Sequence, residues 1–251
     1  MALLTGRSGY VTGAAAGIGE AIAKRLASEG ASVLVTDVDD TNGDRVAKEI
    51  VDAGGQASFL HVDVSREDDV KAMVAKTVEL FGTLDIAVNN AGMGHAPAPL
   101  HELDSQQFDR IMAIDARGVF LGLKHAIAYM REHDIAGSIV NTASGAGLKA
   151  VPDMSIYVAA KHAVVGLTRN AALDYAEHGI RVNAVAPGAI ATPQMAAQGE
   201  DMVAVYGGMM PSKRMGRPDE IGAVVAFLLS DQASYVSGDT MEVDFAFMQK
   251  S

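Results

Sequence analysis

The stretch that decides the fold reads VTGAAAGIG and spans residues 11–19. Its glycines, Gly13, Gly17 and Gly19, permit a tight turn and let the backbone approach a pyrophosphate closely. A helical pattern from Ile18 to Ser28 follows, so the N-terminus of the expected helix faces the same negative charge. The spacing is G-x3-G-x-G, which differs from the general dinucleotide fingerprint G-x-G-x-x-G. Taken alone the stretch is also compatible with an ordinary turn, so its interpretation depends on other residues.

Short β-branched runs alternate with longer helical patterns along the whole chain. Such alternation indicates parallel strands joined by helical crossovers, with helices on both faces of the sheet. We therefore expect a single α/β domain over residues 1–251, a Rossmann-like doubly wound parallel sheet. The expected strands are Ser8–Thr12, Ser32–Thr36, Ala57–His61, Leu84–Val88, Gly137–Thr142, Arg181–Ala186 and Thr240–Val243. Ligands of such sheets bind at the carboxyl ends of the strands.

Composition excludes several classes of function. The formal charge of −11 and the lack of clustered Lys and Arg argue against nucleic acid and anionic membranes as partners. Without any cysteine there is no disulfide, thiolate nucleophile or zinc–thiolate site, and the seven histidines lack zinc-protease spacing, so we expect no metal. The first residues are too short in their apolar part for a secretory signal, and no run reaches membrane-spanning length. A cytoplasmic protein is expected.

Asp37 ends the second expected strand, twenty-four residues after Gly13. A carboxylate at this place can accept hydrogen bonds from the ribose diol of an adenosine. A 2′-phosphate would face Asp37, Asp39 and Asp40 with no nearby arginine to receive it, and Ala16 occupies a loop position where a basic residue could stand. The sequence therefore predicts NAD as cofactor in preference to NADP. The alternative is that Asp37 is a solvated loop acid.

Further candidates for cofactor contacts follow the third and fourth strands. Asp63 and Val64 could flank the adenine, with Asp63 accepting from its amino group. Asn90, Ala91 and Gly92 would bring backbone close to the cofactor. Asn and Gly are common at strand ends, so each is a weak signal by itself.

Tyr157 and Lys161 stand four residues apart at the start of a long helical pattern, so their side chains share a helix face. A phenol with a solution pKa near 10 is a poor base at neutral pH. An adjacent ammonium, together with an oxidised nicotinamide, favours the phenolate. Ser144, thirteen residues upstream of Tyr157, would hydrogen-bond the substrate oxygen. The pair alone could be a surface tyrosine beside a solvated lysine, but the glycine-rich loop and Ser144 favour an acid–base group.

These residues together resemble a classical short-chain dehydrogenase/reductase over essentially the whole chain. The matching residues are Thr12-Gly13-x3-Gly17-x-Gly19, Asp63, Asn89-Asn90-Ala91-Gly92, Ser144, Tyr157-x3-Lys161, Asn183, Pro187-Gly188 and Gly216-Arg217-Pro218. The resemblance implies a sheet of seven strands and hydride transfer between a secondary alcohol and NAD, or the reverse from a ketone. It also implies that Tyr157 exchanges the proton, that Ser144 steadies the substrate oxygen, that Lys161 contacts the nicotinamide ribose, and that Pro187, Gly188, Ile190 and Thr192 lie at the nicotinamide. Members of the family are commonly tetramers, so a homotetramer is expected.

Three features depart from the family pattern. Asp115 stands where the family usually has an asparagine that supports a water relay to the lysine. Its carboxylate could bind that water while raising the pKa of Lys161 and diluting its help to Tyr157, or it could pair with Arg117 or another cation and be structural. The first strand, with Ser8, Gly9 and Tyr10, is less apolar than usual, and Phe245 and Phe247 add bulk where the family often has Asp-Gly-Gly, which could alter a subunit contact or a pocket wall.

The substrate side should be covered by a lid over about residues 193–215, which is rich in apolar side chains including methionines. We expect an apolar alcohol or ketone, although the same side chains could only seal the lid against the protein body. The candidate pocket residues are Ser144, His95, Val151, Met154, Met195 and Tyr206, with His95 as a polar rim group.

Three functions remain open at this point. The first is an active NAD-dependent secondary-alcohol dehydrogenase. The second is a catalytically impaired NAD-binding sensor or scaffold, suggested by Asp115 and opposed by the intact Ser144, Tyr157 and Lys161. The third is an acyl-thioester ketoreductase of lipid synthesis, which would usually need NADPH and is opposed by the acids around Asp37.

Overall fold

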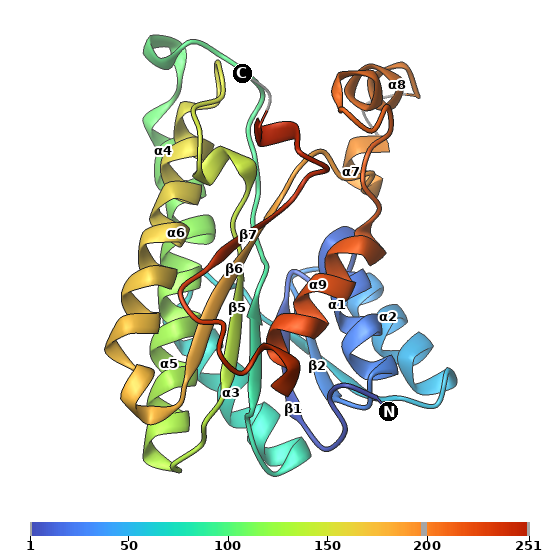
Figure 1. Ribbon diagram of the computed structural model, residues 1–251, viewed down its shortest axis with the longest axis vertical. Coiled ribbons are helices and arrows are strands. Elements are labelled where there is room, and N and C mark those ends of the chain that lie inside the picture. The colour runs from blue at the N-terminus through green and yellow to red at the C-terminus, as the bar shows by residue number, and fades with distance from the viewer. Residues whose placement is uncertain (1, 197–199, 250–251) are drawn as a thin grey trace.

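The computed structural model describes residues 2–196 and 200–249. These residues form one parallel sheet of seven strands in the order β3-β2-β1-β4-β5-β6-β7 (Figure 1). Every predicted strand is present, with ends that shift by a few residues at most. The strands are β1 (Ser8–Thr12), β2 (Ser32–Asp37), β3 (Gln56–His61), β4 (Ile86–Asn89), β5 (Ser138–Thr142), β6 (Arg181–Pro187) and β7 (Thr240–Val243). The predicted Rossmann-like doubly wound fold is confirmed.

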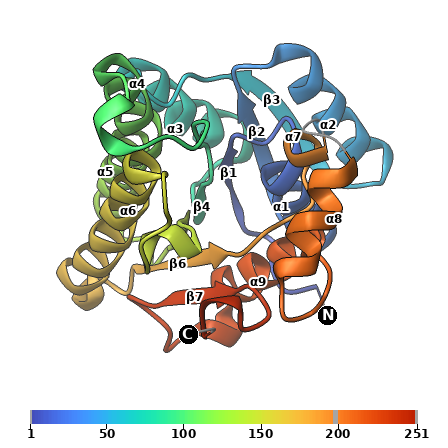
Figure 2. The same ribbon diagram turned by 90° about the horizontal axis from the view of Figure 1, so that it is seen from above.

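Helices cover both faces of this sheet (Figure 2). The helices are α1 (Gly17–Ser28), α2 (Asp40–Asp52), α3 (Glu67–Phe81), α4 (Ser105–Ile111), α5 (Gly118–Glu132), α6 (Ser155–Asp174), α7 (Pro193–Ala196), α8 (Glu200–Met209) and α9 (Pro218–Leu229). On one face Val11 packs in a cluster with Ile22 of α1 and Val225 of α9. On the other face its neighbour Tyr10 packs in a cluster with α3, α5 and α6. Alternate residues of β1 therefore serve two cores, as the two-residue period of a strand requires.

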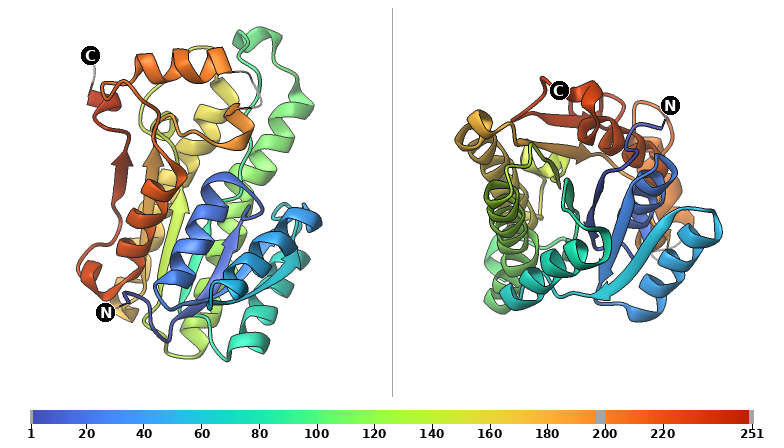
Figure 3. Two further views of the ribbon diagram at one scale, coloured as in Figure 1. Left: turned by 90° about the vertical axis from the view of Figure 1, so that its right-hand side faces the viewer. Right: turned by 90° about the horizontal axis from the view of Figure 1, so that it is seen from below.

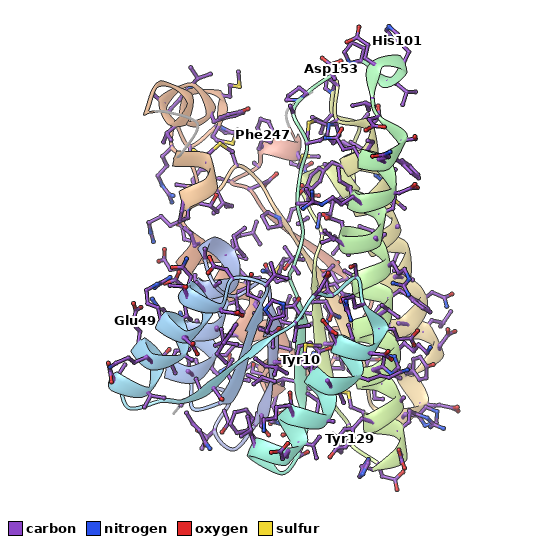
Figure 4. All side chains as sticks on the ribbon, turned by 180° about the vertical axis from the view of Figure 1, so that it is seen from behind. Tyr10, Glu49, His101, Tyr129, Asp153 and Phe247 are labelled. Carbon is purple, nitrogen blue, oxygen red and sulfur yellow. The ribbon has the colours of Figure 1, made fainter. Side chains whose placement is uncertain are left out.

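The polar first strand is fully buried in the centre of the sheet. Gly9 is required there, because a Cβ would lie 1.8 Å from the carbonyl oxygen of Ile86. The hydroxyl of Tyr10 donates to Asn89 Oδ1 at 3.2 Å and to the carbonyl of Gly122 at 3.3 Å, and Figure 4 shows this side chain in the interior. Each polar group of this unusual strand thus has a partner, which removes the penalty of burying it.

The carboxyl ends of all seven strands point to one end of the molecule, the upper end of Figure 1. The loops after β1, β2, β4, β5 and β6 meet there, and α7 and α8 stand over the side next to α9 (Figure 3). The predicted lid of about residues 193–215 corresponds to α7, α8 and the turn that follows, although residues 197–199 lie outside the described residues. No helix in the described ranges combines the length and apolar character needed to cross a bilayer.

Candidate active site

The glycine-rich loop has the backbone shape that its glycines predict. Gly13 and Gly17 adopt positive φ values of 63° and 61°, a region that glycine enters without steric cost. Gly19 packs so closely that a Cβ would lie 2.0 Å from the carbonyl oxygen of Gly13. Helix α1 begins at Gly17 with Ile18 in its first turn and has no side-chain cap, so its first N–H groups are available to an anion.

Asp37 lies at the end of β2 and touches this loop. One carboxylate oxygen accepts from the backbone N–H of Ala15 at 3.0 Å, and the other accepts from Val38 and Asp39 at 2.7 and 3.1 Å. The carboxylate is therefore fixed beside the place where a ribose would follow a pyrophosphate bound by the loop. It is not a freely solvated loop acid.

Contrary to the expectation from sequence, an arginine does lie near this cluster. Arg45 on α2 donates to the carbonyl of Ala15 at 3.1 Å. Its guanidinium also forms ion pairs with Glu20 and Glu49 at 2.9 and 3.0 Å. Because two carboxylates and a carbonyl occupy its donors, Arg45 is poorly placed to neutralise a 2′-phosphate. No local pattern in the sequence predicts these contacts, since Arg45 and Glu20 are 25 residues apart.

The loop after β4 is built against the glycine-rich loop. The side-chain amide of Asn90 donates to the carbonyls of Thr12 and Gly13 at 3.0 and 3.2 Å. A Cβ on Gly13 would lie 2.7 Å from the Cα of Ala91. These two loops thus hold each other in place, which supports their predicted placement at the cofactor.

Asp63 caps the turn after β3, where it accepts from both the backbone N–H and the hydroxyl of Ser65 at 2.9 and 2.7 Å. Val64 is buried against Gly118, whose Cβ would lie 2.9 Å from a Val64 methyl. Both residues therefore have structural contacts, and their role at an adenine stays a prediction.

The predicted acid–base residues lie at the start of α6. The ammonium of Lys161 is 5.5 Å from the ring centroid of Tyr157 and donates to the carbonyl of Thr142 at 3.2 Å. Ser144 begins a short turn in which its Oγ accepts from the N–H of Ala146 at 3.1 Å. Ser144 and Tyr157 are partly exposed, whereas Lys161 is buried. The two residues that would touch a substrate are thus accessible, and the residue that would act through Tyr157 is not.

Asp115 joins this group directly. It lies in a π-helical segment, Met112–Arg117, between α4 and α5, and its Oδ2 is 3.1 Å from the ammonium of Lys161. The alternative pairing with Arg117 is wrong, because Arg117 donates instead to the carbonyl of Ser65. Burial opposes the charge of Lys161, but the negative charges of Tyr157 and Asp115 outweigh it and raise the pKa of Lys161. Burial raises the pKa of Asp115, against the opposing effect of Lys161. The predicted direction for the lysine is confirmed.

The loop after β6, predicted to lie at the nicotinamide, leads into α7 at the start of the predicted lid. Thr192 lies within 3.4 Å of a Cβ placed on Gly17, and its hydroxyl accepts from the N–H of Met195 at 3.3 Å. Ile190 is 6% exposed and packs into the core, so backbone groups are what this residue can offer a ligand. Gly188 lies against Asp244, just beyond β7.

The lid side chains divide into two sets. Met210 and Met215 are buried against the body of the protein, whereas Val205 and Met209 are exposed. Met195 and Tyr206 are partly exposed. The alternative prediction, that apolar side chains only seal the lid against the protein body, therefore holds for Met210 and Met215. A cavity of about 260 Å³ lies between the end of the lid and β7, with Ile190, Met210 and Phe245 in its wall, and Tyr157 does not line it.

The other predicted pocket residues lie in two neighbouring loops. The N–H of Ala98 donates to the carbonyl of Asp153 at 3.0 Å, which ties the loop after β4 to the segment with Val151 and Met154. His95 places its Nδ1 2.8 Å from the carbonyl of Ala96, and its buried Nε2 has no hydrogen-bond partner within residues 2–196 and 200–249. The role of His95 at the pocket rim stays a prediction.

One wall of the site is formed by the C-terminal tail, where the sequence singles out Phe245 and Phe247 but not Met248. The C-terminal residues fold back over the loop that begins with Ser144: Met248 is buried, and its sulfur would lie 2.8 Å from a Cβ on Gly145. Lys149 donates to the carbonyl of Met248. Figure 4 shows Phe247 from this tail at the same end of the molecule as Asp153. The hydrogen bond joins residues 99 positions apart, which no local pattern signals.

A Rossmann-like sheet with a tyrosine–lysine pair beside a glycine-rich loop defines a nicotinamide-dependent oxidoreductase. The comparisons with known proteins agree: residues 13–246 match a family model described as enoyl-(acyl carrier protein) reductase. The chain is 44% identical over 250 residues to 2,5-dichloro-2,5-cyclohexadiene-1,4-diol dehydrogenase of Sphingobium indicum, covering 98% of this chain and 99% of the relative. It is 44% identical to cis-4-hydroxycyclohexanecarboxylate dehydrogenase of Sinomonas cyclohexanicum, with 95% of each chain covered.

Among solved structures, levodione reductase superposes with a TM-score of 0.94 at 40% identity, covering 99% of this chain and 100% of that one. The chain belongs to the short-chain dehydrogenase/reductase family. It is an oxidoreductase that acts on CH–OH groups.

Proposed function

We propose that this protein is an NAD-dependent dehydrogenase of a secondary alcohol on a six-membered carbon ring, or a reductase of the corresponding ketone. The observation that carries the proposal is the buried ammonium of Lys161, 5.5 Å from the ring of the accessible Tyr157. The ring preference rests on the names of the two relatives, both of which denote alcohols on six-membered carbon rings. The apolar side chains of the lid suit such a ring.

The described residues fit a dinucleotide, because any Cβ at Gly19 would collide with the loop that cradles the phosphates. We assign the phosphates to Gly13, Gly17, Ile18 and Gly19, and the adenosine ribose to Asp37. We assign the adenine to Asp63 and Val64. The nicotinamide end is assigned to Asn90, Ala91, Gly92, Pro187, Gly188, Ile190 and Thr192. NAD is favoured over NADP because Asp37 is fixed at the ribose position while Glu20 and Glu49 hold Arg45. A bound nicotinamide supplies the hydride acceptor for oxidation and the hydride donor for reduction.

The protein residues handle the proton. The hydroxyl of Ser144 donates a hydrogen bond to the substrate oxygen and holds it beside Tyr157. In ketone reduction the hydroxyl of Tyr157 gives its proton to that oxygen, and in oxidation the phenolate takes the proton of the alcohol. The ammonium of Lys161 stabilises the phenolate by its positive charge. We place His95, Val151, Met154, Met195 and Tyr206 around the substrate.

Assembly and location also remain proposals. We propose a homotetramer in the cytoplasm. The large apolar side chains left exposed on the outer helices support an association, and they include Phe108 on α4, Phe120 on α5 and Leu173 on α6. Light scattering of the purified protein would measure the mass of the assembly, and a monomer would reject the tetramer.

The test is turnover with NAD on a panel of ring alcohols: cyclohexanol, 1,4-cyclohexanediol and 4-hydroxycyclohexanecarboxylate, read as NADH absorbance. Tyr157→Phe should lower kcat by about 100-fold or more, the usual contribution of a general acid–base. Tyr235→Phe is the matched control, because Tyr235 is fully exposed and should leave the rate unchanged.

Three outcomes would change the proposal. Tight NADH binding without turnover of any alcohol or ketone would favour the sensor or scaffold function. Faster turnover of acyl thioesters with NADPH would favour the ketoreductase function. Full activity of Tyr157→Phe would reject the proposed proton transfer.

A further inference from the structure

A buried ion pair lies directly behind the acid–base tyrosine. The ammonium of Lys161 is 3.1 Å from Oδ2 of Asp115, and the two side chains are 3% and 0% exposed. Charges removed from water in this way are stable only when they are paired and their remaining donors and acceptors are satisfied. Oδ1 of Asp115 accepts a backbone hydrogen bond, whereas Oδ2 has no hydrogen-bond partner among the described residues, so its charge is compensated by the neighbouring ammonium of Lys161.

Two segments close around the pair, the loop after β4 and the end of β5. The N–H of Met93, in the loop after β4, donates to Oδ1 of Asp115 at 2.8 Å. The carbonyl of Thr142, at the end of β5, accepts from Lys161 at 3.2 Å. Gly92 covers both groups, since a Cβ there would lie 2.8 Å from Asp115 Oδ2 and 3.0 Å from Lys161 Nζ. Tyr157 lies beside this enclosed pair, with the ammonium of Lys161 5.5 Å from its ring centroid, so the charge of the pair acts on the phenol.

We infer that Asp115 is a positioning residue that keeps Lys161 charged inside the protein and thereby sets the pH range in which Tyr157 exchanges its proton. This inference rests on the proposed function. The charged groups facing the pair are Tyr157, on the same helix as the lysine, and the two members themselves. Arg117, from the segment that carries Asp115, is engaged by the carbonyl of Ser65.

The negative charge of Asp115 has two opposite effects on catalysis. It cancels part of the positive charge that Tyr157 experiences, so the phenolate forms at a higher pH than beside an unpaired ammonium. It also offsets the burial that would otherwise discharge Lys161, so the ammonium persists at a higher pH. Both effects move the working range toward alkaline pH. A neutral residue at this position would move both limits of that range toward lower pH.

Asp115→Asn tests the inference, because the amide keeps the shape of the carboxylate and an oxygen for the N–H of Met93 while removing the charge. In NAD-dependent oxidation, the rising limb of the kcat profile, which reports Tyr157, should move by about one pH unit to lower pH. The falling limb, which reports Lys161, should move down by about one to three units, the range for loss of an opposite charge at this distance. Asp109→Asn is the matched control, an exposed acid on α4 whose loss should leave both limbs in place.

A second measurement does not depend on turnover. Tyrosinate absorbance titrated in the wild type and in Tyr157→Phe gives, by difference, the pH at which Tyr157 ionises. The same difference in the Asp115→Asn background should have a midpoint about one unit lower. Asp115→Ser repeats the test if the asparagine variant does not fold, since its hydroxyl can also accept from Met93.

The outcomes separate the two proposals. Wild-type protein without turnover would reject the proposed function, while the tyrosinate titration would still decide the role of Asp115. A midpoint for Tyr157 that is unchanged or higher in the neutral variants would overturn the inference. So would a kcat that falls equally at every pH, since that is the effect of a merely structural residue.

Discussion

Asp37→Asn is the perturbation that most directly tests the cofactor assignment. The carboxylate receives three backbone N–H groups, those of Ala15, Val38 and Asp39. An asparagine has one acceptor oxygen, so at least one N–H would face an amide NH₂ group that is itself a donor. The substitution therefore removes the charged acceptor for the ribose and also disturbs the loop that supports it.

The expected loss follows from the hydrogen bonds involved. A hydrogen bond to a charged group contributes about 1.5–3 kcal/mol, which corresponds to a Kd for NADH raised by about 10- to 100-fold. The assay is NADH fluorescence titration at fixed ionic strength, with NADPH titrated in parallel. The matched control is Asp44→Asn, which removes the same charge from an exposed position on α2 and should leave both Kd values unchanged.

The NADPH titration tests directly whether Asp37 and the engaged Arg45 determine the preference for NAD. Removing the charge of Asp37 should tighten NADPH binding only slightly, because Asp39 remains and Arg45 is held by Glu20. Adding Glu20→Gln and Glu49→Gln to Asp37→Asn should release Arg45 from both ion pairs and tighten NADPH binding further. An unchanged Kd for NADH in Asp37→Asn, or tighter binding of NADPH than of NADH by the wild type, would refute the reasoning.

Three further predictions concern stability, each read as a thermal unfolding midpoint. Tyr10→Phe leaves the buried Asn89 Oδ1 without its donor and should destabilise the fold by about 1–2 kcal/mol, lowering Tm by about 2–4 °C per kcal/mol; an unchanged Tm would contradict this. Hydrogen bonds from Lys124 and His125 lower the pKa of Glu67 to about 2 from its ordinary 4.5. The stability from this group is therefore present above pH 4.5 and lost as pH falls toward 2. Between these pH values the Tm of Glu67→Gln should fall less steeply than the Tm of the wild type. Equal slopes would argue against the contacts of Glu67 with Lys124 and His125. Ala246 has a φ of 64°, a conformation that costs a non-glycine residue about 1–2 kcal/mol, so Ala246→Gly should raise Tm, and a lower Tm would show that the strain is absent.

The fold could be predicted in full because its signals are local. Each strand is a β-branched run bounded by turn residues, and the alternation with helical patterns admits few topologies. The spacing of Tyr157 and Lys161 likewise sets their common helix face. By contrast, the contacts of Arg45 with Glu20 and of Lys149 with Met248 join residues far apart in the chain. These long-range contacts depend on the angle at which the helices pack and on where the C-terminal tail turns back. No local sequence pattern predicts either of these.

The placement of Asp115 depends both on its position in the sequence pattern and on the three-dimensional path of the backbone. Its position in the aligned pattern predicted proximity to Lys161, while its chemistry left two partners open. The structure decides between them through the π-helical segment Met112–Arg117, whose extra residue per turn directs Asp115 to the lysine and Arg117 to the carbonyl of Ser65. A regular α-helical turn would change the direction of both side chains, so the backbone irregularity is what brings Asp115 to Lys161.

The unusual polar first strand has an explanation in the same site. From Tyr10 a chain of buried hydrogen bonds runs through Asn89 to Asn141 and on to Thr168 of α6, with links of 3.2, 2.9 and 2.9 Å. Thr168 follows Lys161 by seven residues, two helical turns, and so lies on the same helix face. Hydrophobic packing alone would tolerate small rotations of α6, whereas directional hydrogen bonds to its buried face fix its rotation against β4 and β5. Tyr10, one of the residues that make β1 a poor apolar strand, therefore connects the centre of the sheet to the helix that carries Tyr157 and Lys161, and the rotation of that helix sets the direction of both side chains.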